Sequence, residues 1–131
     1  MRKPLLAAAC GAALLLATAA NAAEDDTGAR LYFNHCAACH GEAGEGDGPV
    51  AATLHVMVPN LRTLSQRRDG VFPADTVRAY IDGRELKAAH GDRQMPIWGD
   101  VFRGPEQATA QRTVRRRIDA LVEFIAMLQY R

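Results

Sequence analysis

A short segment of the chain combines two thiols with an imidazole. Cys36 and Cys39 are separated by two alanines, and His40 follows the second cysteine directly, in the stretch HCAACHGEAGEGDGP. Thiol and imidazole groups at this spacing can bind a metal ion, form a redox-active disulfide or attach a haem group. The glycines that follow His40 indicate a turning loop rather than a regular element.

Two of these chemistries lack the partners that they need. Structural zinc requires four ligands, usually from a second CxxC or a closely spaced histidine pair. Outside the motif the chain offers His35, His55 and His90, each isolated, and no further cysteine downstream. We expect these histidines to be surface or structural residues. A thioredoxin-type disulfide belongs beside a βαβ pattern, and no segment shows the alternation of a strand.

Covalent haem attachment uses all three groups of the motif. Each thiol adds to one vinyl group of the porphyrin, and the adjacent imidazole is then carried under the ring, where it can bind the iron. The pattern C-x-x-C-H is the sequence signature of this attachment. The sequence therefore predicts one haem c, attached through Cys36 and Cys39, with His40 as an iron ligand.

The N-terminal residues predict export. Arg2 and Lys3 precede an apolar run over residues 5–17, and Ala20-Asn21-Ala22 is a small-x-small cleavage site. This is the build of a secretory signal peptide, which we assign to residues 1–22. The location expected for the mature protein is therefore the periplasm, where covalent haem is attached in bacteria.

The remaining residues 23–131 have the length of one domain. Cys10 falls inside the leader and away from its cleavage point, so it does not predict a lipid anchor. Without the leader the chain is close to neutral, which gives no support to nucleic-acid binding. We interpret the one basic cluster, Arg112 to Arg117, as a solvated helix face. No segment is long and apolar enough to predict stable membrane insertion.

The elements expected around the motif are all helical. Residues 27–36 and 50–55 read as short helices, and residues 73–83 as a helix with proline at its start and glycine at its end. Residues 114–128 follow the helical period most clearly. Residues 84–108 show no sustained period, and a loop of that length needs a function. The sequence therefore predicts an all-α domain whose few short helices need something further in their core.

These features resemble the class I c-type cytochromes, in particular the small soluble monohaem proteins of bacteria that pair CAACHG with a late MPxWG. The resemblance covers essentially the whole mature chain. In that family a glycine and an aromatic residue before the first haem cysteine let the N-terminal helix cross the C-terminal helix. Here Gly28 and Tyr32 match those positions, and Leu121 and Phe124 match their partners. The resemblance implies three to five short helices and long loops wrapped around one covalent haem.

A second iron ligand is expected from the unpatterned loop. Met95 precedes Pro96, which stiffens the chain there, and a soft thioether in a fixed loop suits haem iron. Met57 is too close to His40 in the sequence to reach the opposite side of the ring easily. The family places its methionine ligand in the same setting as Met95. His90 as a second imidazole, or an open iron position, are the alternatives.

Further residues are expected around the cofactor. The second nitrogen of His40 needs an acceptor, which the family supplies from a proline carbonyl after the haem motif. We choose Pro49 for this role, with Pro59 as the second choice. The haem propionates need donors, for which we name three residues. These are Tyr80, Arg93 and Trp98. For Trp98, simple packing is an equally good interpretation.

The function expected from this reading is one-electron transfer between Fe(II) and Fe(III). Ligation by His40 and Met95 leaves no iron position for a substrate, so the chain is expected to be a carrier and not an enzyme. The expected partners are redox proteins of a respiratory chain, such as a dehydrogenase, an oxidase or another cytochrome, met by a monomer. Two alternatives remain open: a dedicated cytochrome subunit of a periplasmic oxidoreductase complex, and a ligand-binding haem module if Met95 is not bound.

Overall fold

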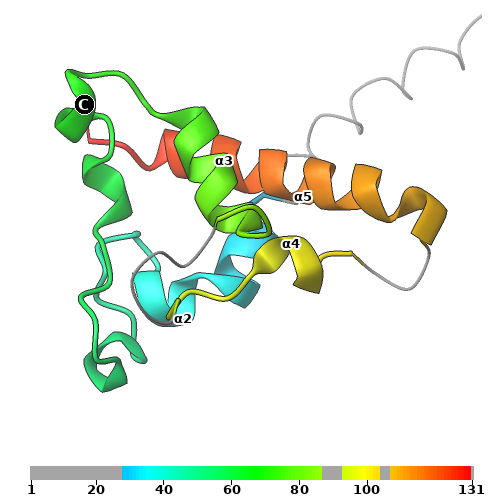
Figure 1. Cartoon of the computed structure of the whole chain (residues 1–131). Helices are drawn as coiled ribbons and strands as arrows, with labels where there is room; N and C mark the ends of the chain where they lie inside the picture. Colours follow the sequence, from blue (N-terminus) through cyan, green and yellow to red (C-terminus); the bar gives the residue numbers. More distant parts are fainter. Residues whose placement is uncertain (1–27, 87–92, 104–106, 131) are drawn as a thin grey trace, which may run out of the picture.

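All regular structure in the described part of the chain is helical, as the sequence predicts. The computed structural model describes residues 28–86, 93–103 and 107–130. In chain order the helices are residues 28–35, α2 (Ala37–His40), η1 (Ala51–Thr53), η2 (Leu61–Thr63), η3 (Gln66–Arg68), α3 (Ala74–Asp82), α4 (Trp98–Val101) and α5 (Gln107–Met127) (Figure 1). The predicted signal peptide, with Cys10, and His90 lie outside the described residues.

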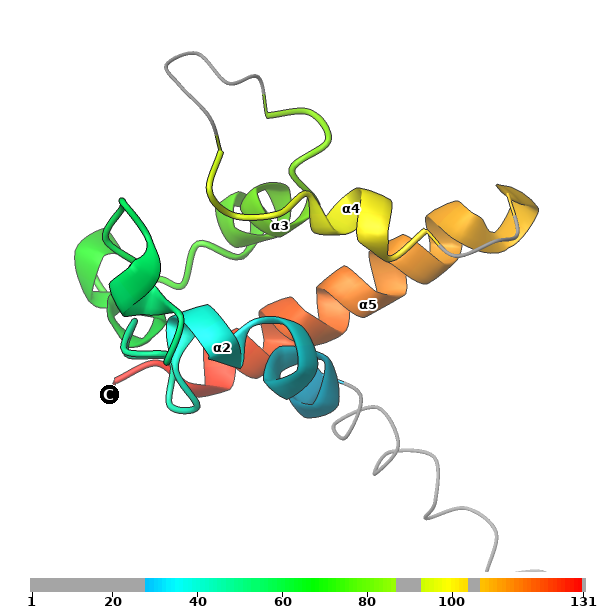
Figure 2. The ribbon, with the colours of Figure 1, turned by 90° about the horizontal axis from the view of Figure 1, so that it is seen from below.

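The long helix α5 is the element on which α3 and the helix over residues 28–35 pack. It carries buried apolar side chains at the helical period, which gives it one continuous core face. These side chains are Val114, Ile118, Leu121, Val122 and Ile125. Helix α3 lies across α5, and α2 and the helix over residues 28–35 lie beside each other on another side of the core (Figures 1 and 2). None of the described helices has the length and apolar character needed to cross a bilayer.

The helix over residues 28–35 crosses α5 at very short range. A Cβ atom added to Gly28 would lie 2.4 Å from the carbonyl oxygen of Ala120, so a larger residue does not fit there. Tyr32 is fully buried, and its ring centroid lies 5.1 Å from that of Phe124. The Tyr32 hydroxyl donates to the carbonyl of Gly41 at 2.7 Å, which ties this crossing to the end of α2. The predicted crossing of the first and last helices is confirmed.

Helix boundaries agree with the sequence where strong end signals exist. Helix α3 ends at Gly83, whose φ of 70° is the left-handed conformation that glycine adopts without strain. The sequence did not predict α4, because a helix of four residues is too short to show a period. Helix α5 begins at Gln107, earlier than predicted, since its first residues, QATAQ, show no apolar period.

Candidate functional site

A cavity of about 480 Å³ lies among the motif helix α2, the segment from Pro59 to Pro73, α3 and Met95. This volume is in the range of about 300–1,000 Å³ that is typical of cofactor sites. Most of its lining is apolar. The lining residues are Cys36, His40, Pro59, Leu61, Leu64, Arg67, Arg68, Pro73, Thr76, Val77, Tyr80, Ile81, Met95 and Ile125.

Both cysteines are free thiols. Cys36 directly precedes α2, and Cys39 lies within it. Cys36 is buried and lines the cavity, and Cys39 is half-buried. Burial raises the pKa of the Cys36 thiol to about 12, and the neighbouring Cys39 adds to this. The His40 amide donates to the Cys36 carbonyl at 2.9 Å, and residues four apart in a helix lie on one face. Cys36 and His40 therefore line the same cavity.

The His40 imidazole is held by a backbone carbonyl outside α2. Its Nδ1 lies 3.3 Å from the Pro59 carbonyl oxygen. Burial lowers the pKa of His40, and the weaker effect of the Pro59 hydrogen bond opposes this. The lowered pKa favours the neutral ring, which is the form that binds a metal ion. When Nδ1 carries the proton and donates to Pro59, the lone pair of Nε2 is available for a metal ion.

Our first choice of Pro49 as the carbonyl that orients His40 was wrong. The Gly48 amide donates to the Cys39 carbonyl at 3.1 Å, and the Val50 amide donates to the Ala38 carbonyl at 2.9 Å. These bonds hold Pro49 against the backbone of α2, with its side chain exposed, while the chain continues to Pro59 before it reaches the imidazole. The second choice, Pro59, is the one that the structure supports.

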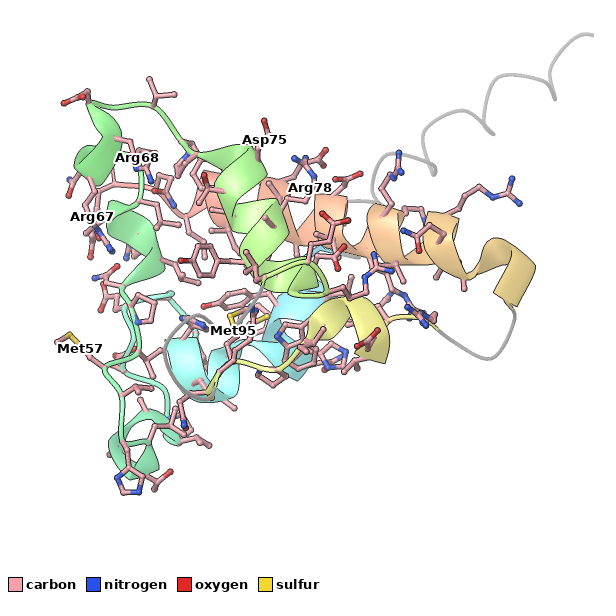
Figure 3. All side chains as sticks on the ribbon, in the orientation of Figure 1. Met57, Arg67, Arg68, Asp75, Arg78 and Met95 are labelled. Carbon is pink, nitrogen blue, oxygen red and sulfur yellow. The ribbon has the colours of Figure 1, made fainter. Side chains whose placement is uncertain are left out.

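Met95 lines the cavity from a segment remote in the sequence from His40. It is partly buried and packs against the hydrophobic core. Met57 is 93 % exposed and points outward, whereas Met95 lies near the centre of the molecule (Figure 3). Met127, in α5, is also mostly exposed. Among the described residues that line the cavity, Met95 is the one methionine.

Arg93 fixes the position of Met95. Its Nε donates to the carbonyl of Met95 at 2.7 Å, and its Nη2 donates to the carbonyl of Tyr80 in α3. The guanidinium also covers Gly83, where an added Cβ would lie 3.0 Å from it. We expected Arg93 to bind a propionate, but the structure shows it joining the Met95 segment to α3.

Helix α4 packs on α3 through a glycine. A Cβ atom at Gly99 would lie 2.2 Å from Asp82 Oδ1 and 2.8 Å from the Asp82 carbonyl oxygen. Asp82 is itself held by Arg84, with Nη2 and Oδ2 at 2.7 Å. This hydrogen-bonded pair lowers the pKa of Asp82, and partial burial opposes the shift. The close approach follows from the missing side chain, and it brings the segment after Met95 against α3.

Comparison with known families agrees with this geometry. The family model for cytochrome c matches residues 26–129, which is most of the chain. The chain belongs to the cytochrome c family. No curated protein and no solved structure shows significant similarity to it. It is therefore a haem-based electron carrier that acts with redox partners, and it carries haem c attached covalently.

The cavity of this cytochrome c fits that cofactor. Its apolar lining suits a large flat ring, the buried Cys36 thiol and the His40 imidazole belong to that lining, and the half-buried Cys39 lies one residue before His40, outside the lining. Met95 adds a thioether, and Arg67 and Arg68 add positive charge, which suits the carboxylates of a haem. The donor set thus supplies groups for the vinyl side chains, the iron and the propionates.

Sequence reasoning missed the two arginines. The Nη2 of Arg67 donates to the Asn60 carbonyl at 2.6 Å and to Thr63 Oγ1 at 2.7 Å, so its side chain is held at the cavity. Its neighbour Arg68 also lines the cavity. The sequence signal was available, because two adjacent arginines stand in the loop between Pro59 and α3.

Tyr80 and Trp98 occupy different surroundings. Tyr80 lines the cavity and is 58 % exposed, so its role as a propionate donor stays a prediction. Trp98 lies outside the set of described residues that line the cavity. Its ring stacks on Phe102 at 5.6 Å and lies 5.2 Å from His35. The packing interpretation therefore describes Trp98 better, and His35 is a half-buried member of the same aromatic cluster.

Proposed function

We propose that this cytochrome c is an exported, periplasmic one-electron carrier whose haem iron is bound by His40 and Met95. The observation that carries the proposal is that an imidazole and a thioether line one apolar cavity from two separate segments. When bound, the haem iron supplies a one-electron couple, and His/Met ligation places its potential high within the haem range. The leader pattern over residues 1–22 supports export.

The chain's own residues position the cofactor and exclude water from it. Cys36 and Cys39 tether the ring edge, and Pro59 fixes the plane of His40 through Nδ1. Arg93 holds the backbone of Met95. The apolar lining from α3 and α5 keeps water away from the iron, which limits the solvent reorganisation that a change of charge requires. If His40 and Met95 both bound the iron, they would leave it no position for a substrate.

Substitution of the methionine tests the ligation. In the haem-loaded protein we expect Met95→Ala to abolish the weak far-red sulfur-to-iron absorption band, lower the reduction potential and allow the reduced protein to bind carbon monoxide. Met57→Ala is the matched control, because its thioether is 93 % exposed and points away from the cavity. It should leave all three measurements unchanged.

Two results would contradict the proposal. If Met95→Ala retains the band and the potential, another residue is the ligand. If the wild-type reduced protein binds carbon monoxide at once at neutral pH, the iron has an open position and the ligand-binding alternative is correct. The location is tested separately, by finding the mature protein in the periplasmic fraction with its N-terminus at Ala23.

A further inference from the structure

A groove of about 850 Å³ runs between the helix over residues 28–35 and the N-terminal half of α5. It is separate from the cavity, because the two share no lining residue. Arginines dominate its lining, with two carboxylates toward one end. The residues concerned are Arg30, Arg112, Arg115, Arg116, Arg117, Asp119 and Glu123.

Three of these arginines form a cluster without charge compensation in the described structure. Arg112, Arg115 and Arg116 are exposed, and none makes an ion pair with a residue that the structure describes. The carboxylate of Asp119 is already bound by Arg78 at 2.8 Å. Like charges three and four residues apart on a helix repel each other and lower its stability. A cluster that the fold does not use therefore points to a ligand outside the chain.

The arginine end of the groove lies far along α5 from the cavity, although Glu123 at its other end is close to it. Ile125 lines the cavity, and with 1.5 Å of rise per residue Arg112 lies roughly 20 Å from it along the helix. The N-terminal half of α5 extends beyond α4, away from α2 and the segment that carries Met57 (Figures 1 and 2). A partner held in the groove would therefore leave the cavity and its rim uncovered.

We infer that this groove binds an acidic segment of a partner protein and so anchors the cytochrome at a surface separate from its electron-transfer site. The inference rests on the proposed function only in that the partner is taken to be a redox protein. Arginine forks pair with carboxylates through two parallel hydrogen bonds. The groove shape and the scarcity of large apolar side chains in it favour a polar protein segment. A shaped segment can place its carboxylates at Arg112, Arg115 and Arg116 and keep them away from Asp119 and Glu123 at the other end, whereas a flat phosphate-bearing membrane would also approach those two carboxylates and be repelled.

The test uses the haem-loaded mature protein and a fluorescent poly-glutamate peptide, with binding followed by anisotropy at low and at physiological salt. We expect Arg112→Gln/Arg116→Gln to weaken binding roughly tenfold. Each exposed ion pair between an arginine and a peptide carboxylate lowers the dissociation constant by a factor of about three to five at most. The matched control is Ala52→Glu/Val71→Glu, at two exposed positions outside the groove. Both double variants lower the net charge equally, so a difference between them reports the groove itself.

The outcomes separate this inference from the proposed function. The inference is supported if only the groove variant loses peptide binding, while its haem spectrum and potential stay those of the wild type. It is overturned if both double variants lose binding equally, because net charge alone then explains the effect. It is also overturned if vesicles of phosphatidylglycerol bind more tightly than the peptide with the same dependence on Arg112 and Arg116, since the ligand is then a membrane surface. The far-red sulfur band reports Met95 ligation in every variant.

Discussion

The two walls of the cavity that carry the proposed iron ligands His40 and Met95 are built differently. The His40 wall is held by backbone hydrogen bonds between α2 and the glycine loop that follows it, such as the Gly46 amide to the His40 carbonyl at 2.8 Å and the Gly48 amide to the Cys39 carbonyl at 3.1 Å. The Met95 wall depends mainly on side chains at its contact with α3. Arg93 reaches α3 from the Met95 segment, and Gly99 packs on the pair formed by Asp82 at the end of α3 and Arg84.

This difference indicates which wall opens first. The hydrogen bonds between the glycine loop and α2 join residues that are close in the sequence. They are exchanged for bonds to water only when this segment unfolds. The Met95 segment instead relies on a few partly exposed side-chain contacts with an element that is distant along the chain. Segments with few such contacts open with a smaller free energy than the global unfolding energy. We therefore expect loss of the Met95 ligand to precede loss of the His40 ligand.

The largest effect is expected at Gly48, on the His40 wall. A Cβ there would lie 2.4 Å from the Ala38 carbonyl oxygen, 2.6 Å from the Cys39 carbonyl carbon and 2.7 Å from the Ala37 carbonyl oxygen. These are backbone atoms of α2 and cannot rotate away, so Gly48→Ala should cost about 3 kcal/mol in free energy of unfolding. Denaturant unfolding of the haem-loaded protein measures it. Gly70→Ala is the control, because its site has no atom within 4 Å and reports only its positive φ. Equal losses at both positions would contradict the packing argument.

A smaller and more local effect is expected at Gly99, on the Met95 wall. The nearest atoms to an added Cβ are Asp82 Oδ1 at 2.2 Å and Arg84 Nε at 2.5 Å, which belong to side chains that can move, with the Asp82 carbonyl oxygen next at 2.8 Å. We expect Gly99→Ala to cost about 2 kcal/mol. The far-red band should disappear at a lower denaturant concentration than the absorption that follows global unfolding. If both signals shift together, the two walls do not open separately.

Arg93 should affect the same wall by about 1 kcal/mol. Arg93→Lys keeps the positive charge but cannot donate to both Met95 and Tyr80 in the geometry of the guanidinium. The expected result is earlier loss of the far-red band and faster binding of carbon monoxide to the reduced protein, with little change in global unfolding. A merely structural role would lower global stability and leave the carbon monoxide rate unchanged.

The sequence predicted those parts of the molecule whose signal is local. The haem motif places Cys36 and His40 on one helical turn, and Gly83 marks the end of α3 through its left-handed backbone. The crossing at Gly28 was also predicted, through the family resemblance, because two matched positions far apart in the sequence imply a contact. In each case a residue type is required by its own backbone or by a fixed spacing.

The parts that the sequence did not predict depend on tertiary placement. Pro49 and Pro59 each offer a backbone carbonyl of the same kind. Only the path of the loop across α2 decides which carbonyl reaches His40. Arg93 has the same donors whether they bind a cofactor or a backbone carbonyl. The role of Arg67 follows from the position of η3 beside the cavity, which no periodic pattern reports.

The smallest predicted effect depends on pH and is expected in the Met95 wall but not in the His40 wall. Arg84 lowers the pKa of Asp82 in the folded protein below its unfolded value of about 3.9. The resulting stabilisation is therefore present above that value and is lost as the pH falls through the lower, folded pKa. Asp82→Asn should cost less than 1 kcal/mol at neutral pH, because the pair is partly exposed, and nothing at a pH below both values. Denaturant titration of the far-red band at neutral and acid pH measures the difference.

The control is Asp75→Asn, since Asp75 is fully exposed in its pair with Arg78 and lies outside the Met95 wall. Gly99 of the Met95 wall packs against Asp82. A loss that is the same at every pH, or one that moves the His40 signal equally, would therefore show that the pair of Asp82 and Arg84 acts on the whole fold and not on that wall.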